Sequence, residues 1–182
     1  MSRNHLVLFE PEIPQNTGNC MRTCVGTNTT LHLIKPLGFN FDDVKVKRSA
    51  VNYFKHLKYF IYENFEDFMN KNPNGKKYYL SRYGLKSPHE LVLDKEDEDY
   101  YFIIGKESTG IPKEILKEHL DECIRLPMTD KIRALNMSNV AAIVIYEALR
   151  QQDYQGLERY EPEIYKGKNY LLNKYPNNHY TP

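Results

Sequence analysis

Cysteine is scarce in this chain, and its spacing argues against two kinds of protein. Only Cys20, Cys24 and Cys123 are present, an odd number that contains no C-x-x-C pair. The histidines form no cluster at the spacing of a zinc site. Both a disulfide-stabilised secreted domain and a zinc-binding domain are therefore disfavoured, and we expect reduced thiols and no metal site.

Long apolar runs and excess charge are lacking too. No apolar segment approaches the length of a membrane span, and the N-terminus Met-Ser-Arg-Asn-His is polar, so we expect neither a transmembrane helix nor a signal peptide. The formal net charge is only +1, so a nucleic-acid partner must be held by a local patch rather than by the whole surface. These features predict a cytoplasmic protein with no membrane partner.

Two familiar nucleotide-binding motifs are also missing. The segment Gly105-Lys106-Glu107-Ser108 superficially resembles a phosphate loop, but the G-x-x-x-x-G-K-[ST] order is absent. No G-x-G-x-x-G follows the first apolar segment, and no Ser–His–Asp or Cys–His arrangement is identifiable. A P-loop ATPase and a Rossmann dehydrogenase are therefore disfavoured.

Short apolar segments alternate with helical patterns along a chain long enough for one ordinary domain. Strands are expected at residues 6–9, 31–34, 59–62, 78–81, 100–104 and 123–126. Helices are expected at about residues 20–27, 42–56, 64–70, 113–119 and 140–149. This alternation, with several strands apolar throughout, predicts an α/β fold whose mostly parallel sheet has helices on both faces. We expect one domain over residues 1–154, and a tail over residues 155–182 that is an appendage or partly disordered.

The stretch from Ile124 to Leu149 is the most informative, because a strand, a polar loop and an amphipathic helix follow one another there. Asn136 and Ser138 are both suited to cap the start of that helix. In open α/β sheets, ligands bind at the carboxyl ends of the strands. The polar loops at residues 14–22, 105–112 and 127–139 are therefore candidates for one shared site.

Each of these three loops carries a motif, and the motifs occur in a definite order. They are Pro11-Glu12-Ile13-Pro14-Gln15-Asn16-Thr17-Gly18-Asn19 with Arg22, then Ile104 to Pro112, then Ile124 to Met128 with Arg133 to Asn139. Together they resemble the SPOUT methyltransferases, and more narrowly the small tRNA 2′-O-methyltransferases of the TrmL (YibK-like) group. The resemblance covers about residues 6–152. It departs from the family at Ala134, where serine is frequent, and at Ala50-Val51-Asn52, where Gly-Leu-Asp is usual.

The resemblance implies a SPOUT domain over residues 1–154, with a deep trefoil knot in its C-terminal part. The methyl donor S-adenosylmethionine would lie bent in the knot, held largely by backbone groups. By position, four residues should contact the donor and four should lie close to it: Leu80, Gly105, Leu126 and Ala134, then Ser81, Glu107, Ile124 and Leu135.

The resemblance also implies a homodimer that acts on the anticodon stem-loop of tRNA without a metal ion. The methylated group would be the ribose of the wobble nucleotide, cytidine 34 or 5-carboxymethylaminomethyluridine 34, in leucine tRNA isoacceptors. Two alternatives stay open. One is a 2′-O-methyltransferase of another RNA such as rRNA, and the other is a knotted RNA-binding protein without catalysis.

Four residues are the expected catalytic group: Asn16, Arg22, Ser138 and Asn139. The family proposal makes Arg22 a general base, yet a guanidinium stays protonated under almost all conditions. We therefore expect Arg22 to bind the adjacent phosphate and stabilise the developing alkoxide. Asn16 and Asn139 would orient the nucleotide or brace Arg22, and Ser138 would position the loop.

Structural interpretations of the same residues stay open beside these. Arg22 would otherwise form a surface salt bridge, Ser138 and Asn139 would only cap a helix, and Glu107 would be a solvated loop residue. Tyr53 would serve either packing or stacking on an anticodon base. A group of basic residues is either a solvated face or a patch that contacts anticodon-stem phosphates: Lys45, Lys47, Arg48 and Lys55.

Overall fold

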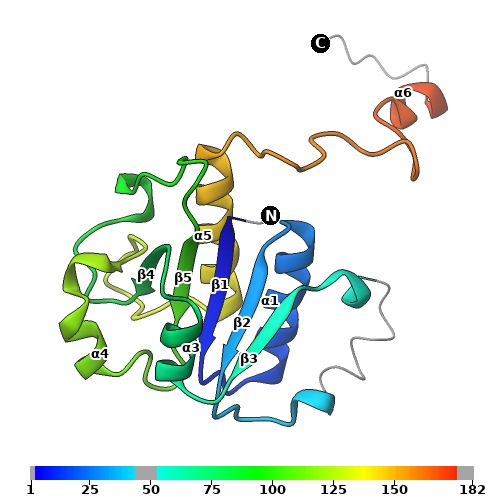
Figure 1. Ribbon diagram of the computed structural model, residues 1–182. Helices are drawn as coiled ribbons and strands as arrows, with labels where there is room; N and C mark the ends of the chain where they lie inside the picture. The colour runs from blue at the N-terminus through cyan, green and yellow to red at the C-terminus, as the bar shows by residue number, and fades with distance from the viewer. Residues whose placement is uncertain (1–2, 44–52, 176–182) are drawn as a thin grey trace.

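The computed structural model describes residues 3–43 and 53–175, which form a six-stranded sheet covered by helices (Figure 1). The strands are β1 (Asn4–Phe9), β2 (Thr30–Ile34), β3 (Tyr59–Tyr62), β4 (Lys76–Leu80), β5 (Tyr100–Ile104) and β6 (Cys123–Ile124). Their order in the sheet is β3-β2-β1-β5-β4-β6, and every pairing between these strands is parallel. The prediction of an α/β fold with a parallel sheet is confirmed.

Helices lie on both faces of the sheet. They are α1 (Pro14–Gly26), α3 (Phe65–Lys71), α4 (Lys113–Glu118) and α5 (Met137–Gln151), with 3-10 turns η1 (Phe54–His56), η2 (Pro88–Glu90) and η3 (Leu120–Glu122). A further helix, α6 (Tyr170–Lys174), follows in the C-terminal segment. Because successive strand side chains point to opposite faces, Leu6 and Leu8 of β1 pack with α1 and α5, whereas Val7 and Phe9 pack with α3 and α4. Within the described ranges, no helix has the length and apolar character of a membrane span.

Several expected boundaries were wrong, and two of them bear on the candidate site. The helix expected from about residue 20 begins at Pro14, whose fixed φ suits the first helical position, and Asn16 and Thr17 are buried in its first turn. The strand expected over residues 123–126 ends at Ile124, because its partner strand β4 ends at Leu80, the residue in register with Ile124. The next amide, that of Arg125, donates to the Lys86 carbonyl in the loop after β4. Of the helix expected over residues 42–56, residues 44–52 lie outside the described ranges.

Helix α5 runs from the carboxyl edge of the sheet to its amino edge. At its start the Asn136 side chain accepts from the Ser138 amide, so Asn136 is the cap. At its end the side-chain amide of Gln152 pairs with that of Asn4, the first residue of β1, at 2.8 and 3.0 Å, and also donates to the Leu93 carbonyl. Beyond this pairing the chain runs away from the sheet, and α6 lies apart from the rest of the fold (Figure 1).

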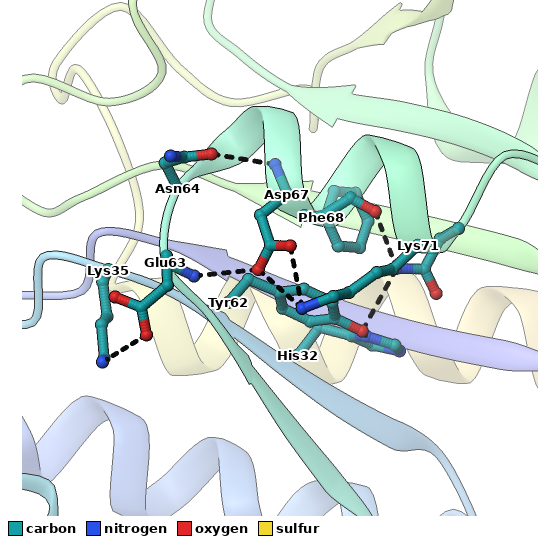
Figure 2. A network of polar contacts seen from close by, with 9 residues as sticks. His32, Lys35, Tyr62, Glu63, Asn64, Asp67, Phe68 and Lys71 are labelled. Carbon is teal, nitrogen blue, oxygen red and sulfur yellow. Dashed lines mark hydrogen bonds and ion pairs between the residues drawn. The ribbon is translucent and has the colours of Figure 1, made fainter.

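A buried polar network links β1, β2 and β3 on the α3 side of the sheet. Figure 2 shows the part of this network that contains His32 and Tyr62. His32 Nδ1 lies 2.8 Å from the Tyr62 hydroxyl, and His32 Nε2 lies 2.9 Å from Nδ1 of His5. Because the Asn72 side chain donates to the Tyr62 oxygen, the Tyr62 hydroxyl can donate to His32, and His32 can donate to His5. Burial, reinforced by the neighbouring His5, lowers the pKa of His32 to about 3. His32 is therefore neutral in the folded protein.

This neutral histidine should make the fold acid-sensitive. An unfolded histidine takes up a proton below about pH 6.5, but folded His32 does not until about pH 3, so stability falls as the pH falls between those values. From this side chain alone, the free energy of unfolding should be about 2 kcal/mol lower at pH 5 than at pH 8. Urea denaturation at several pH values measures the slope. His32→Gln should remove that part of the slope and exposed His89→Gln should keep it; a slope unaltered by His32→Gln would contradict the assignment.

Candidate functional site at the carboxyl edge of the sheet

The Glu107 carboxylate connects the loop after β5 with the loop after β1. It accepts hydrogen bonds from the backbone amides of Glu12 at 2.8 Å and Ile13 at 3.3 Å, and from the Asn16 side chain at 2.9 Å. The two amides lie directly before α1, where helix geometry leaves donors without partners. Glu107 is therefore bound to protein groups and is not the solvated loop residue of the alternative interpretation.

Asn16 extends this connection to the third loop. Its side-chain oxygen accepts from the Asn136 side chain at 2.9 Å. The Asn136 oxygen in turn accepts from the Ser138 amide at 2.9 Å and from the Ser138 hydroxyl at 2.7 Å. One chain of hydrogen bonds thus runs from Glu107 through Asn16 and Asn136 to Ser138, and joins all three loops expected to share a site.

A second set of hydrogen bonds also joins the loop after β1 to the loop after β5. Here the accepting carboxylate belongs to the loop after β1. The Glu12 carboxylate accepts from the hydroxyl of Ser108 at 2.8 Å and from its amide at 2.9 Å. These bonds hold the pKa of the Glu12 carboxyl below its ordinary value, and the charge of Lys106 adds to the effect. Lys106 forms an ion pair with Glu10 at 2.7 Å, which raises the pKa of Lys106. Since each loop both donates to and accepts from the other, their relative position is fixed on both sides.

Two glycines allow close backbone contacts at this edge. A Cβ on Gly105 would overlap the backbone of Gly110 and Ile111, so the loop after β5 can fold back on itself only with glycine there. A Cβ on Gly84 would likewise overlap the backbone of Ile124 in β6. Gly105 was an expected site residue. Gly84 was not, because its partner lies forty residues further along the chain.

The apolar residues expected around the donor lie in one cluster. Ile124 and Leu126 are buried in it, with Leu80 and Leu135 packed against them. Leu80 ends β4 and is in register with Ile124 and with Ile104 at the ends of the neighbouring strands. We call Leu80, Ile124, Leu126 and Leu135 the apolar wall; they belong to a core cluster that also contains Val144, Ile145, Ala148 and Leu149 of α5. Ala134 is exposed in the loop before α5, outside the cluster.

Arg22 lies apart from the hydrogen-bond chain. It is exposed on α1, and its guanidinium carbon is 5.7 Å from the centroid of the Tyr53 ring. Among the described residues it forms no salt bridge, so the salt-bridge interpretation is not supported.

The two asparagines at the start of α5 differ in their contacts. Both are exposed, but Asn136 contacts Asn16 directly, whereas the Asn139 side chain, in the first turn of α5, has no hydrogen-bond partner among the described residues. From the sequence, Asn136 was expected to act only as a helix cap and Asn139 to lie at the site. The missed signal was that Asn136 itself lies within the candidate loop of residues 127–139, so a cap at this position belongs to the site.

The remaining expectations concern basic residues and metal ligands. Lys45, Lys47 and Arg48 lie outside the described residues, and Lys55 is exposed on η1 next to half-buried Tyr53. In the part of the chain that the structure describes, no group of three or more His, Cys, Asp and Glu side chains is arranged to hold a metal ion.

In an open parallel α/β sheet, ligands bind in loops at the carboxyl edge, so the three cross-linked loops define a candidate ligand site. The profile of the SpoU rRNA Methylase family matches residues 3–146, so the chain belongs to that family of RNA methylases.

Several similar proteins support a narrower assignment within the family. A Geobacillus stearothermophilus protein with the provisional name tRNA (cytidine(34)-2′-O)-methyltransferase is 48% identical over 153 residues, which are 84% of this chain and 98% of the relative. A Bacillus anthracis structure, provisionally named as an RNA methyltransferase, is 51% identical with a TM-score of 0.81, covering 85% of this chain and 97% of that chain. A structure on the 2-OH methylation of C/U34 on tRNA is 35% identical with a TM-score of 0.73, covering 82% and 90% of the two chains.

SpoU methylases take the methyl group from S-adenosylmethionine. A more distant structure with the same fold, AviRb from Streptomyces viridochromogenes, was solved in complex with AdoMet. It is 18% identical with a TM-score of 0.66, and the aligned part covers 82% of this chain and 57% of that chain.

The Glu107 carboxylate should be needed to hold the loops together. Glu107→Ala leaves the Asn16 side chain and two backbone amides without their acceptor, so the free energy of unfolding should fall by about 1–3 kcal/mol. Chemical denaturation measures the loss, and hydrogen exchange should show faster exchange at the Glu12 and Ile13 amides. Glu118→Ala, an exposed carboxylate of α4, is the matched control and should change neither quantity. Equal effects of the two substitutions would refute the role of Glu107.

Proposed function

We propose that this protein transfers the methyl group of S-adenosylmethionine to the ribose 2′-hydroxyl of the wobble nucleotide, position 34, of tRNA. The observation that carries the proposal is the hydrogen-bond chain from Glu107 through Asn16 to Asn136, which brings the three methyltransferase motifs to one place. The similarity to proteins named for this reaction, over nearly their whole length, supports the substrate.

The donor would lie against the apolar wall of Leu80, Ile124, Leu126 and Leu135. Backbone groups near Gly105 and Ala134 would bind its polar parts. The anionic Glu107 favours a cationic sulfonium nearby, although its oxygens already accept three hydrogen bonds. Glu107 therefore acts mainly by holding the loops in place around the donor.

The reaction needs the ribose oxygen in line with the methyl group and needs its proton removed as the new bond forms. Arg22 would bind the neighbouring phosphate and stabilise negative charge on that oxygen. Asn16 is held by Glu107 and Asn136, so it is a fixed group that can orient the nucleotide. Ser138 would position the third loop through Asn136, while exposed Asn139 is free to contact the RNA.

We propose a homodimer, in which α1 and α5 face the partner. These helices cover the same face of the sheet, and their outer sides expose apolar residues: Ile13 before α1, and Ile143 and Tyr146 on α5. The anticodon stem-loop of a leucine tRNA would be the bound part of the substrate, with Lys55 among its phosphate contacts. A protein with this substrate would work in the cytoplasm.

We also propose that the C-terminal part of residues 1–154 forms a deep trefoil knot. Two features support it. The loop after β4 lies against β6, because the Gly84 backbone closely approaches Ile124 and the Arg125 amide donates to Lys86. The chain then returns to α5, whose end binds both the amide and the carbonyl of Leu93 on the far side of the same loop. A chain that passes through the loop between Ser81 and Leu93 would satisfy both contacts.

The alternative substrate rRNA has one observation in its favour, because the matching family is described as rRNA methylases. Incubation of the purified protein with isotope-labelled donor and total RNA, followed by mass spectrometry of the modified nucleotide, separates the two substrates. Label at position 34 of tRNA supports the proposal. Label in rRNA alone would replace tRNA as the substrate, and no label at all would indicate a binding protein.

Arg22→Ala should lower kcat by about 10²–10³-fold, the loss typical when a group that stabilises a developing oxyanion is removed. The same assay with a saturating donor measures it, and donor affinity should stay unchanged because Arg22 lies outside the donor wall. Arg150→Ala is the matched arginine control, because Arg150 lies in the last turn of α5, at the end away from Asn136. This variant should keep its methyl-transfer activity.

Arg22→Lys separates the two roles of the residue. A lysine keeps the charge, so it should retain part of the activity with an unchanged pH profile if Arg22 stabilises charge. A general base would instead gain activity as the lysine loses its proton near pH 10. Full activity of Arg22→Ala would exclude both roles.

A further inference from the structure

The C-terminal part of this chain lies outside the family profile, which matches residues 3–146. Residues 155–175 leave the sheet after α5 and end with α6 (Figure 1). We call residues 155–175 the tail.

Charge is divided along the tail. Its three carboxylates lie in the first half, at Glu158, Glu161 and Glu163. Residues 164–175 contain three lysines, at Lys166, Lys168 and Lys174, and no acidic residue. The second half is therefore a local basic segment on a protein whose overall charge is close to zero.

Tyrosines are placed among these lysines at regular intervals. They recur at every fifth position: Tyr160, Tyr165, Tyr170 and Tyr175. The Lys168 ammonium lies 4.1 Å from the centroid of the Tyr160 ring, and the Lys166 and Lys174 ammonium groups lie 4.9 and 5.3 Å from that of Tyr170. Each lysine charge is thus presented next to an aromatic ring.

The rings are accessible. Tyr165 is 74% exposed, and Tyr160 and Tyr175 are also more than half exposed. Aromatic rings interleaved with cations are the means by which proteins bind unpaired nucleotides, because rings stack on bases while cations contact phosphates. A membrane surface or a protein partner would use the exposed leucines of α6, but neither would require this pairing of each lysine with a tyrosine ring.

We propose that the tail is a second tRNA-binding element, in which Lys166, Lys168 and Lys174 contact phosphates and the exposed tyrosines stack on unpaired bases. This inference rests on the proposed tRNA substrate and adds a contact that lies outside the shared family region.

The position of the tail separates this contact from the chemistry. The tail starts where Gln152 pairs with Asn4, at the amino edge of the sheet, whereas Asn16 and Glu107 lie at the carboxyl edge. The six residues of β1 separate the two edges by roughly 20 Å. The tail of one protomer therefore binds tRNA away from that protomer's own site, and it should affect KM for tRNA rather than kcat.

The test compares full-length variants in tRNA binding by fluorescence anisotropy and in methyl transfer. The lysine variant combines Lys166→Gln, Lys168→Gln and Lys174→Gln. It should raise both Kd and KM for tRNA about tenfold and leave kcat unchanged. Loss of three phosphate contacts should also reduce the slope of log K against log salt by about 2 to 3. The matched glutamate control combines Glu158→Gln, Glu161→Gln and Glu163→Gln. It removes the same number of charges and should not weaken tRNA binding.

A second variant, which combines Tyr165→Leu with Tyr175→Leu, tests stacking and should weaken tRNA binding several-fold.

The outcomes separate this proposal from the proposed function. A wild-type protein that binds tRNA through the tail but transfers no methyl group overturns the enzymatic proposal alone. An active wild type, with Kd, KM and salt slope unaltered in the lysine variant, overturns the tail proposal alone. The tail proposal would also be overturned if the glutamate control weakened tRNA binding as much as the lysine variant does. It would be overturned as well if the wild type did not bind tRNA, or if the lysine variant changed only the oligomeric mass measured by light scattering.

Discussion

The candidate site depends on one partly buried carboxylate. Glu107 accepts from two backbone amides before α1 and from the Asn16 side chain, and so joins the ends of β1 and β5. An anion beside the free amides at a helix start is favoured by their partial positive charge, and hydrogen bonds to an ionised acceptor are among the strongest in proteins. The position of Asn16, and through it of Asn136, follows from this contact.

Asn136 couples formation of α5 to formation of the site. Its oxygen caps the helix by accepting from Ser138, and its nitrogen donates to Asn16, so one amide serves both. A helix that unwound at this end would release the third loop from the other two. The opposite end of α5 is also fixed, by the pairing of Gln152 with Asn4. The longest helix in the described part of the chain is therefore held at both edges of the sheet, and the site inherits that rigidity.

Much of the fold was predictable because parallel strands buried on both faces are apolar throughout, and such runs are visible in a sequence. Local pattern failed where tertiary contacts decide the outcome. The first turns of α1 look like a polar loop because Asn16 and Thr17 are polar, yet they are buried against the other loops. The roles of Gly84 and of neutral His32 depend on partners far away in the chain. The motifs indicated three loops that the structure joins by hydrogen bonds, but only spatial arrangement could show that Asn136, and not Asn139, contacts Asn16.

The two halves of the proposed site differ in how firmly the folded protein holds their side chains in place before a ligand binds. The side assigned to the donor is built before binding, with an apolar wall packed in the core and loops fixed by at least six hydrogen bonds. The side assigned to the ribose has exposed Arg22 and exposed Asn139, with no polar partner holding either side chain among the described residues. A fixed donor geometry lowers the entropic cost of in-line attack. A guanidinium left without a carboxylate partner keeps its full charge for the RNA phosphate, so the substrate itself would complete the site.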